Sequence, residues 1–241
     1  MLKSWWADFK RIPYVDTTWF AVWISIYIGF LLLDVIAAPD FWGSSLLKYA
    51  GIFLCSIYAM QKYDRDHKLV LALFFTFLAD TILVWTNYEI AGVFVFCFAQ
   101  LMHFLRLANI ERKYLLFFAA IVSALVIYAG FCHENILYVL ATMYGLLLFT
   151  NLALSIRRYR EHNKDFRARC AMHGFIMFVC CDVCVGLRHL MLDGIIPGQF
   201  LPLIAFLVWV FYYPSQVMLA NSSTEPIRQK PIKVAKKSTI S

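Results

Sequence analysis

The basic residues of this chain occupy every second gap between its long apolar stretches. Of the 22 Lys and Arg residues, all but Lys48 and Arg188 lie in alternate gaps or in the two tails, and the intervening gaps contain none. Short loops rich in Lys and Arg stay on the cytoplasmic side when a membrane protein inserts, so the alternation gives both the number and the direction of the spans. The sequence therefore predicts eight membrane-spanning helices with both termini in the cytoplasm.

The composition agrees with a membrane protein. Hydrophobic residues make up 62% of the 241 positions and charged residues 15%, whereas charged residues are about a quarter of a soluble domain. The net charge of +7 does not indicate nucleic acid, because the basic residues flank apolar helices and lack interleaved aromatic residues. Anionic membrane lipids are the expected partner. The seven Cys are an odd number and lie mostly within the spans, so no disulfide framework is expected.

Each apolar stretch is close to the ~20 residues that cross a ~30 Å hydrocarbon core, and each must be helical because an unpaired backbone finds no water in lipid. We expect an all-α, polytopic bundle forming one transmembrane domain over 1–220, a basic loop over 155–170, and a disordered, basic cytoplasmic tail over 221–241. The expected spans are 18–36, 44–60, 69–86, 90–105, 114–131, 135–154, 171–191 and 199–219.

Ionisable side chains inside the spans are the candidates for function. Burying each of them at the centre of a bilayer costs at least about 2.5–3.5 kcal/mol of free energy, so each is expected to have a partner, a water-filled cavity or a functional role. Asp80 and Asp182 lie in two outward-running helices, each about 17 Å above the inner interface, and Gln100 lies near the same level. The other candidates, closer to one edge or the other, are Asp34, Lys48, His103, Arg188 and His189.

Helical spacing groups these side chains into polar stripes, because residues three, four and seven apart share one side of a helix. We expect the stripes to face a common cavity. Two acids at one depth in a dry site repel each other if both are ionised, so one is expected to keep its proton, as an acid and base pair requires. In the alternative, which stays open, the acids only pair with Lys48 or Arg188 to hold helices together. The stripes are Thr76, Asp80 and Asn87; Asp182, Gly186 and His189; and Trp209, Tyr213 and Gln216.

The sequence contains three weaker patterns. Cys181 and Cys184 form a CxxC, but a single pair in a spanning helix lacks the second pair of ligands of a zinc site, so no metal is expected. His103 and Arg106 are expected to extend to the inner interface. The tetrapeptides 99–102 and 215–218 resemble each other, which leaves open an internal duplication of four helices or a coincidence among apolar residues.

Several segments resemble the YhhN-like membrane proteins, a family that includes the lysoplasmalogenases. They are Leu73 to Leu83 followed by Gly92 and by Phe96 to Leu101, Gly174 to Asp182, and Tyr212 to Gln216. The resemblance implies hydrolysis of the vinyl-ether bond of lysoplasmalogens to a fatty aldehyde and a glycerophospho-alcohol, with the two helix acids of the family falling on Asp80 and Asp182. The chain departs from the family pattern at Ala79, Cys181 and Gln100, where Gly, Ser and often His are found.

The chemistry suits two acids, because vinyl-ether hydrolysis begins with protonation of the β-carbon and continues with addition of water to the oxocarbenium ion. We expect catalysis by Asp80 and Asp182 without a cofactor. The expected location is the plasma membrane of a bacterium, although the topology alone suits an endoplasmic reticulum protein equally well. The expected substrate is a lysophospholipid, whose polar groups contact Gln100, Tyr213, Gln216 and His189. Lys48 or Arg188 either holds its phosphate or neutralises Asp34.

Two other functions stay open. Midplane carboxylates and a repeated half are also features of a proton-coupled transporter, although no span carries a Gly or Pro break in its middle. In the remaining interpretation, the acids only pair the helices of a structural membrane protein.

Overall fold

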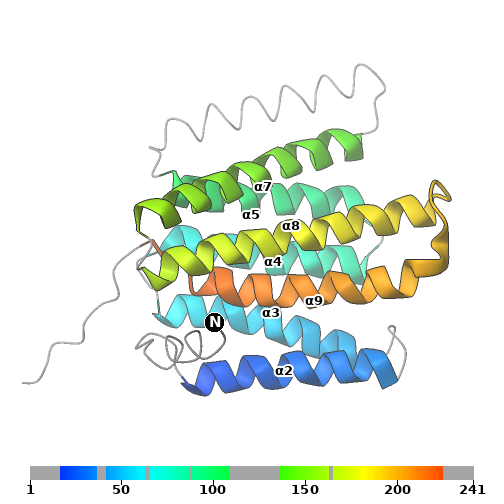
Figure 1. Cartoon of the computed structure of the whole chain (residues 1–241), viewed down its shortest axis with the longest axis horizontal. Helices are drawn as coiled ribbons and strands as arrows, with labels where there is room; N and C mark the ends of the chain where they lie inside the picture. Colours follow the sequence, from blue (N-terminus) through cyan, green and yellow to red (C-terminus); the bar gives the residue numbers. More distant parts are fainter. Residues whose placement is uncertain are drawn as a thin grey trace, which may run out of the picture.

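The structure is a computed structural model that describes residues 17–36, 42–62, 66–86, 88–108, 136–162 and 165–224. This part of the chain is all-α (Figure 1). A short 3-10 helix, η1 (Gly198–Phe200), precedes the last α-helix. The α-helices are α2 (Thr17–Ile36), α3 (Trp42–Lys62), α4 (His67–Trp85), α5 (Glu89–Leu107), α7 (Ile136–Glu161), α8 (Phe166–Leu192) and α9 (Leu201–Ala220).

Within the described ranges, 6 helices are long and apolar enough to cross a membrane: α2, α4, α5, α7, α8, and α9 together with η1. The protein is therefore an integral, multi-pass membrane protein. α3 is as long but falls short in composition, since it carries Ser44, Lys48 and Lys62. Of the expected spans, the one over 114–131 lies outside the described residues.

Six helices close into a ring. α3, α4, α5, α7, α8 and α9 pack in that order, α9 returns to α3, and α2 packs outside the ring on α3 and α9 (Figure 1). Several close approaches in this ring occur at glycines, among them those of α9 to α3 and to α8. A Cβ at Gly51 of α3 would lie 2.2 Å from the Tyr213 ring of α9, and a Cβ at Gly174 of α8 would lie 3.0 Å from the Leu219 side chain. Small residues let neighbouring helices approach closely in this way, and the side chains inside the ring become fully buried.

Two helices extend beyond the expected spans. α7 ends at Glu161 and α8 begins at Phe166, so the loop expected over 155–170 is wrong. Outside the hydrocarbon, local interactions keep these segments helical. Arg157 donates to Glu161 one turn later at 2.8 Å, and the Asp165 carboxylate caps α8 by accepting from the backbone N–H of Arg167 at 3.0 Å.

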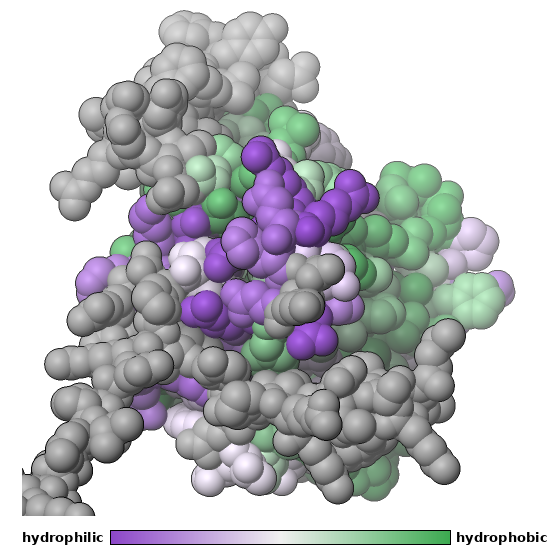
Figure 2. All heavy atoms as spheres, turned by 60° about the vertical axis from the view of Figure 1, so that its left-hand side comes forward, coloured by the Kyte–Doolittle hydropathy of each residue, from purple (hydrophilic) through white to green (hydrophobic). Residues whose placement is uncertain are grey.

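One end of the ring carries a concentration of polar residues, and we call it the polar end, defined by Asp66, Arg106 and Asp165. Figure 2 shows hydrophilic residues gathered on this end and hydrophobic residues along the flank of the molecule. Exposed side chains on the flanks include Leu32, Phe74 and Phe149. An apolar flank above a polar end is the surface that a lipid bilayer and its interface require.

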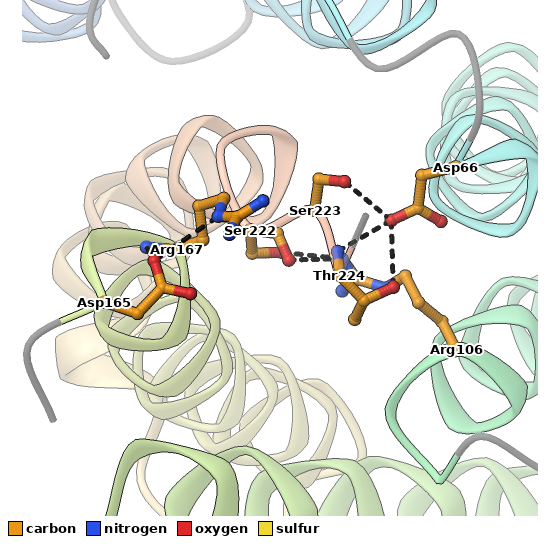
Figure 3. A network of polar contacts seen from close by, with 7 residues as sticks. All are labelled: Asp66, Arg106, Asp165, Arg167, Ser222, Ser223 and Thr224. Carbon is orange, nitrogen blue, oxygen red and sulfur yellow. Dashed lines mark hydrogen bonds and ion pairs between the residues drawn. The ribbon is translucent and has the colours of Figure 1, made fainter. Parts of the chain in front are cut away.

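The segment that follows α9 is fixed at the polar end (Figure 3). The Asp66 Oδ2 atom accepts from the Ser223 hydroxyl and from the backbone N–H of Thr224, each at 2.9 Å. Arg106 donates to the Ser222 carbonyl at 2.7 Å. Ser222 and Ser223 are fully buried, so the packed chain reaches Thr224, beyond the domain end expected at residue 220. The rest of the expected tail lies outside the described residues.

Asp66 is the charged centre of this network. Burial by itself would raise the pKa of the Asp66 carboxyl, but the Arg106 guanidinium and hydrogen bonds from Thr224, Leu69 and Ser223 lower it below its ordinary value. Asp66 also caps α4, because its Oδ1 accepts from the Leu69 backbone N–H at 3.1 Å. The charge of Asp66 therefore ties α4 to the end of α9.

The expectation that His103 and Arg106 extend to the interface is wrong. His103 is fully buried, and Arg106 is 4% exposed. Arg106 is held inside the ring by Ser222, and its Nη2 lies 3.2 Å from His103 Nδ1. The carbonyl and hydroxyl oxygens at the end of α9 solvate the guanidinium from within, so it does not need to reach water.

Candidate functional site

Asp80 lies on the inner face of α4, where its carboxylate is buried. The Tyr212 hydroxyl of α9 donates to Asp80 Oδ2 at 2.6 Å. The Tyr49 hydroxyl donates to the backbone carbonyl of Asp80 at 2.9 Å, which fixes this turn of α4 against α3. The described contacts give Asp80 Oδ1 no partner, so one carboxylate oxygen is held and the other is left for chemistry.

Asp182 is held in the same manner on the other side of the ring. The Tyr144 hydroxyl of α7 donates to Asp182 Oδ2 at 2.6 Å. Among the described residues, Asp182 Oδ1 has no hydrogen-bond partner, and no cation pairs with either acid. Each acid thus receives one neutral donor from a helix other than its own.

Helix register places the two acids at one level. Gly174 of α8 packs on Leu219 of α9, and Asp182 lies about 12 Å further along α8. Because α9 runs in the opposite direction, the same distance leads back to about residue 211, beside Tyr212. We call Asp80, Tyr212, Asp182 and Tyr144 the acid–tyrosine layer.

Aromatic rings connect the two halves of this layer. The Phe178 ring lies 5.6 Å from the Tyr212 ring and 6.4 Å from the Phe96 ring, and Phe96 lies 5.7 Å from Tyr144. The buried Cys181 precedes Asp182 on α8. The surroundings of the acids are therefore aromatic and apolar, which favours a neutral, proton-carrying group over two charged ones.

Gln100 and Gln216 lie toward the polar end from the acids, one turn after Phe96 and Tyr212 respectively. Both are fully buried. The Asn151 amide of α7 donates to the backbone carbonyl and to the side-chain oxygen of Gln100, both at 2.9 Å. Gln216 donates to Ser215 Oγ at 3.2 Å. Neither glutamine has a hydrogen bond to an acid among the described contacts.

Lys48 is paired with Asp34 and not with the acid–tyrosine layer. Its Nζ lies 2.8 Å from Asp34 Oδ2, and Ser44 donates to the same carboxylate. The ammonium also lies 5.0 Å from the Trp209 ring centroid, in cation–π geometry. Lys48 therefore neutralises Asp34.

The remaining predicted residues lie apart from the acids. Arg188 and His189 are exposed near the far end of α8. Tyr213 points to the other side of α9, where its hydroxyl donates to the Trp23 carbonyl at 3.3 Å and its ring stacks on Tyr27. The neighbouring residue Tyr212 occupies the place beside Asp80 that the stripe assigned to Tyr213.

Sequence reasoning missed Tyr212, Tyr144 and Asn151. A tyrosine in an apolar stretch is as common at the lipid interface as in a site, so its type alone gives no signal. Spacing could not identify Tyr212 either, because Tyr212 and Tyr213 both lie three or four residues from Trp209 and from Gln216.

No group of three or more His, Cys, Asp or Glu side chains that could hold a metal ion occurs in the described part of the chain. Cys181 and Cys184 are free cysteines. The acid–tyrosine layer itself consists of carboxyl and hydroxyl groups, which are able to exchange protons with a bound molecule.

The chain was compared with known proteins. The model of the YhhN family matches residues 43–223, a range that runs from α3 to Ser223 at the polar end and includes both acids. No curated protein and no solved structure matches the chain.

Proposed function

Because the chain belongs to the YhhN family, we propose that it is a membrane-embedded hydrolase that cleaves the vinyl-ether bond of lysoplasmalogen lipids, as the lysoplasmalogenases of that family do. One observation carries the proposal. Asp80 and Asp182 lie at one level in an apolar ring, each with one oxygen held by a tyrosine and the other without a described partner. Two carboxyl groups arranged in this way supply an acid and a base without a metal.

The reaction uses the pair in two steps. One protonated acid gives its proton to the β-carbon of the vinyl ether, which leaves an oxocarbenium ion that the other carboxylate stabilises. That carboxylate then takes a proton from the attacking water, and the resulting hemiacetal separates into a fatty aldehyde and a glycerophospho-alcohol. The water supplies the oxygen of the aldehyde, and the proton balance of the pair is restored when the hemiacetal collapses.

The tyrosines position the acids in this scheme. Tyr212 and Tyr144 each donate to Oδ2, so Oδ1 is the oxygen that exchanges protons with the substrate. Gln100 and Gln216 lie one turn away and orient water or the polar part of the lipid. Arg188 and His189, exposed toward the far end of α8, are available to the phosphate of the head group.

The proposal includes a topology. Eight spans, with both termini in the cytoplasm, put the polar end on the cytoplasmic side of a bacterial plasma membrane. The head group of the lipid then faces the outer side, and its single chain lies among the apolar helices. The transmembrane domain is the catalytic domain in this arrangement, and it includes the packed residues up to Thr224.

The test is aldehyde release from lysoplasmalogen by purified protein in detergent, followed by mass spectrometry. Asp80→Asn and Asp182→Asn are each expected to lower the rate at least about 100-fold, because each removes one proton-transfer group. Asp193→Asn is the matched control, since Asp193 is exposed at the end of α8, and this variant is expected to keep full activity. Unchanged turnover by both site variants would end the proposal.

The same preparation separates the other two functions. Proton uptake in vesicles without any new aldehyde would indicate a carrier. If the protein releases no aldehyde and takes up no protons, it is a structural membrane protein whose acids only join helices.

A further inference from the structure

A column of buried polar side chains runs inside the ring between the acid–tyrosine layer and the polar end. Each member is at most 4% exposed. Each also has one polar atom without a hydrogen-bond partner among the described residues. The polar column consists of Gln100, His103 and Arg106 on α5, Asn151 on α7 and Gln216 on α9.

Contacts above and below bring these side chains together. Above, Phe96 and Tyr212 both contact the Phe178 ring, and Gln100 and Gln216 follow them by one helical turn, about 5.4 Å. Below, the Arg106 guanidinium donates to the Ser222 carbonyl at 2.7 Å. The parallel helices α5 and α9 are therefore joined on both sides of the two glutamines.

The other two members lie in the same interval. Asn151 is hydrogen-bonded to Gln100 at 2.9 Å. His103 lies between Gln100 and Arg106 on α5, and its ring packs edge-on against Phe175 at 5.2 Å. The side chains thus follow one another from the acid–tyrosine layer down to the network of Figure 3.

The unpartnered atoms identify the ligand by their chemistry. Gln100 Nε2 and Arg106 Nε are donors, and so is His103 Nε2, because His103 Nδ1 accepts from the Arg106 guanidinium. Asn151 Oδ1 and Gln216 Oε1 are acceptors. A bound cation would need acceptors only, and a bound anion donors only. Water both donates and accepts, and buried water commonly satisfies two to four such groups.

We propose that the polar column binds a file of water molecules that leads from the polar end to the acid–tyrosine layer. The hydration of the column does not depend on the proposed function. Its use as the source of the water that adds to the oxocarbenium ion does rest on that function. Without water, each of these buried atoms would lose its hydrogen bonds on folding, a cost that natural structures rarely carry in one place.

The test is footprinting with hydroxyl radicals produced by X-ray radiolysis, because radicals formed from bound water oxidise the side chains beside it. His103 and Phe175 are the reporters, since both are fully buried. We expect both to be oxidised in the wild-type protein several-fold faster than Cys55 of α3, which is equally buried but intrinsically more reactive. Oxidation of His103 and Phe175 no faster than that of Cys55 would overturn the proposal.

Two variants locate the water. Asn151→Leu and Gln216→Leu each remove an acceptor, and each is expected to lower the oxidation of His103 and Phe175 several-fold. Thr76→Val is the matched control, because Thr76 is fully buried but its hydroxyl is satisfied by the Ala72 carbonyl of its own helix at 3.0 Å. Oxidation that falls equally in all three folded variants would contradict the column.

Aldehyde release by the same variants keeps the two proposals apart. A slower release by Gln216→Leu together with lower oxidation supports water delivery. Normal oxidation in a wild-type protein that releases no aldehyde would refute the proposed function and leave the hydrated column in place.

Discussion

Asp34 and Asp80 are the same residue type inside the helical bundle, but the structure satisfies them in different ways. Asp34 receives the ammonium of Lys48 at 2.8 Å and the hydroxyl of Ser44. Within the described part of the chain, the Asp80 carboxylate receives only the neutral hydroxyl of Tyr212. In an ion pair, the cation neutralises the carboxylate, and the pair holds two helices together. A single neutral donor orients the carboxyl group and leaves one of its oxygens available.

The other two acids divide along the same line. Asp66 is surrounded by Arg106 and three hydrogen-bond donors at the polar end, and it belongs with Asp34 as a structural acid. Asp182 receives the Tyr144 hydroxyl and belongs with Asp80. The side chain that contacts each carboxylate, and not the depth or the residue type, therefore separates acids that hold the fold from acids fit for proton transfer.

The largest expected effect is on the Asp34 pair. Lys48→Met leaves a buried carboxylate with Ser44 as its only remaining described partner, so we expect the free energy of unfolding to fall by about 3–5 kcal/mol. An SDS unfolding titration in mixed micelles measures the loss. The double variant Asp34→Leu and Lys48→Met should recover most of it, because an apolar pair needs no compensation. If Lys48→Met is as stable as the wild type, Asp34 does not depend on its ion pair and belongs with Asp80, not with the structural acids.

Asp66 offers the second test, through pH. Asp66→Asn is expected to lower the free energy of unfolding by about 2–3 kcal/mol, because charged hydrogen bonds to a buried group are lost. The pKa of Asp66 is lower in the folded state, so its contribution is complete above the ordinary value of about 4 and is lost as the pH falls through the lower folded value. Titrations of both proteins between about pH 3 and pH 7 measure this difference.

The difference in stability between wild type and Asp66→Asn should stay constant above about pH 4 and narrow below it. A difference that already narrows between pH 7 and pH 5 would contradict a lowered pKa at Asp66.

Two adjacent tyrosines give the third test. Tyr212→Phe and Tyr213→Phe each remove one buried hydroxyl bond, to Asp80 and to the Trp23 carbonyl respectively, so each is expected to lose about 1 kcal/mol of stability. Only Tyr212→Phe should slow aldehyde release, by about tenfold, which corresponds to about 1.4 kcal/mol in the barrier. Equal rates in the two variants would remove the positioning role of Tyr212.

The smallest expected effect is the stability of Asp80→Asn. Because the amide oxygen is the same size and still accepts the hydrogen bond of Tyr212, the free energy of unfolding should change by less than about 1 kcal/mol. Its loss of activity would then be independent of stability. A loss of stability as large as that of Lys48→Met would assign Asp80 to the structural acids.

Much of the fold could be predicted from local patterns. The helices at Thr17–Ile36, His67–Trp85 and Glu89–Leu107 lie within a few residues of the expected spans. The patterns were less successful where helices leave the hydrocarbon, as between α7 and α8, because hydropathy marks the apolar core and not the end of hydrogen bonding. For Arg106, the expected interface contact was wrong because the acceptors at Ser222 come from a distant helix.

Some residues of the candidate site could also be predicted from the sequence, and others could not. Asp80, Asp182, Gln100 and Gln216 could be selected because polar groups in an apolar stretch stand out along the chain. Their partners could not, because Tyr212 and Tyr144 have the same chemistry as tyrosines that face lipid. Only the rotation of α9 separates Tyr212, which reaches Asp80, from Tyr213, which packs against Gly51 and Tyr27.

Hydropathy and charge are properties of each segment and need no neighbour, so they were enough to predict a membrane protein of apolar helices with acids inside them. Packing was needed to show that Lys48 neutralises Asp34, that tyrosines hold Asp80 and Asp182, and that five polar side chains lie between these acids and the polar end. A hydrogen bond requires two groups within about 3 Å, and helices distant in the chain meet only after packing fixes their rotation and register.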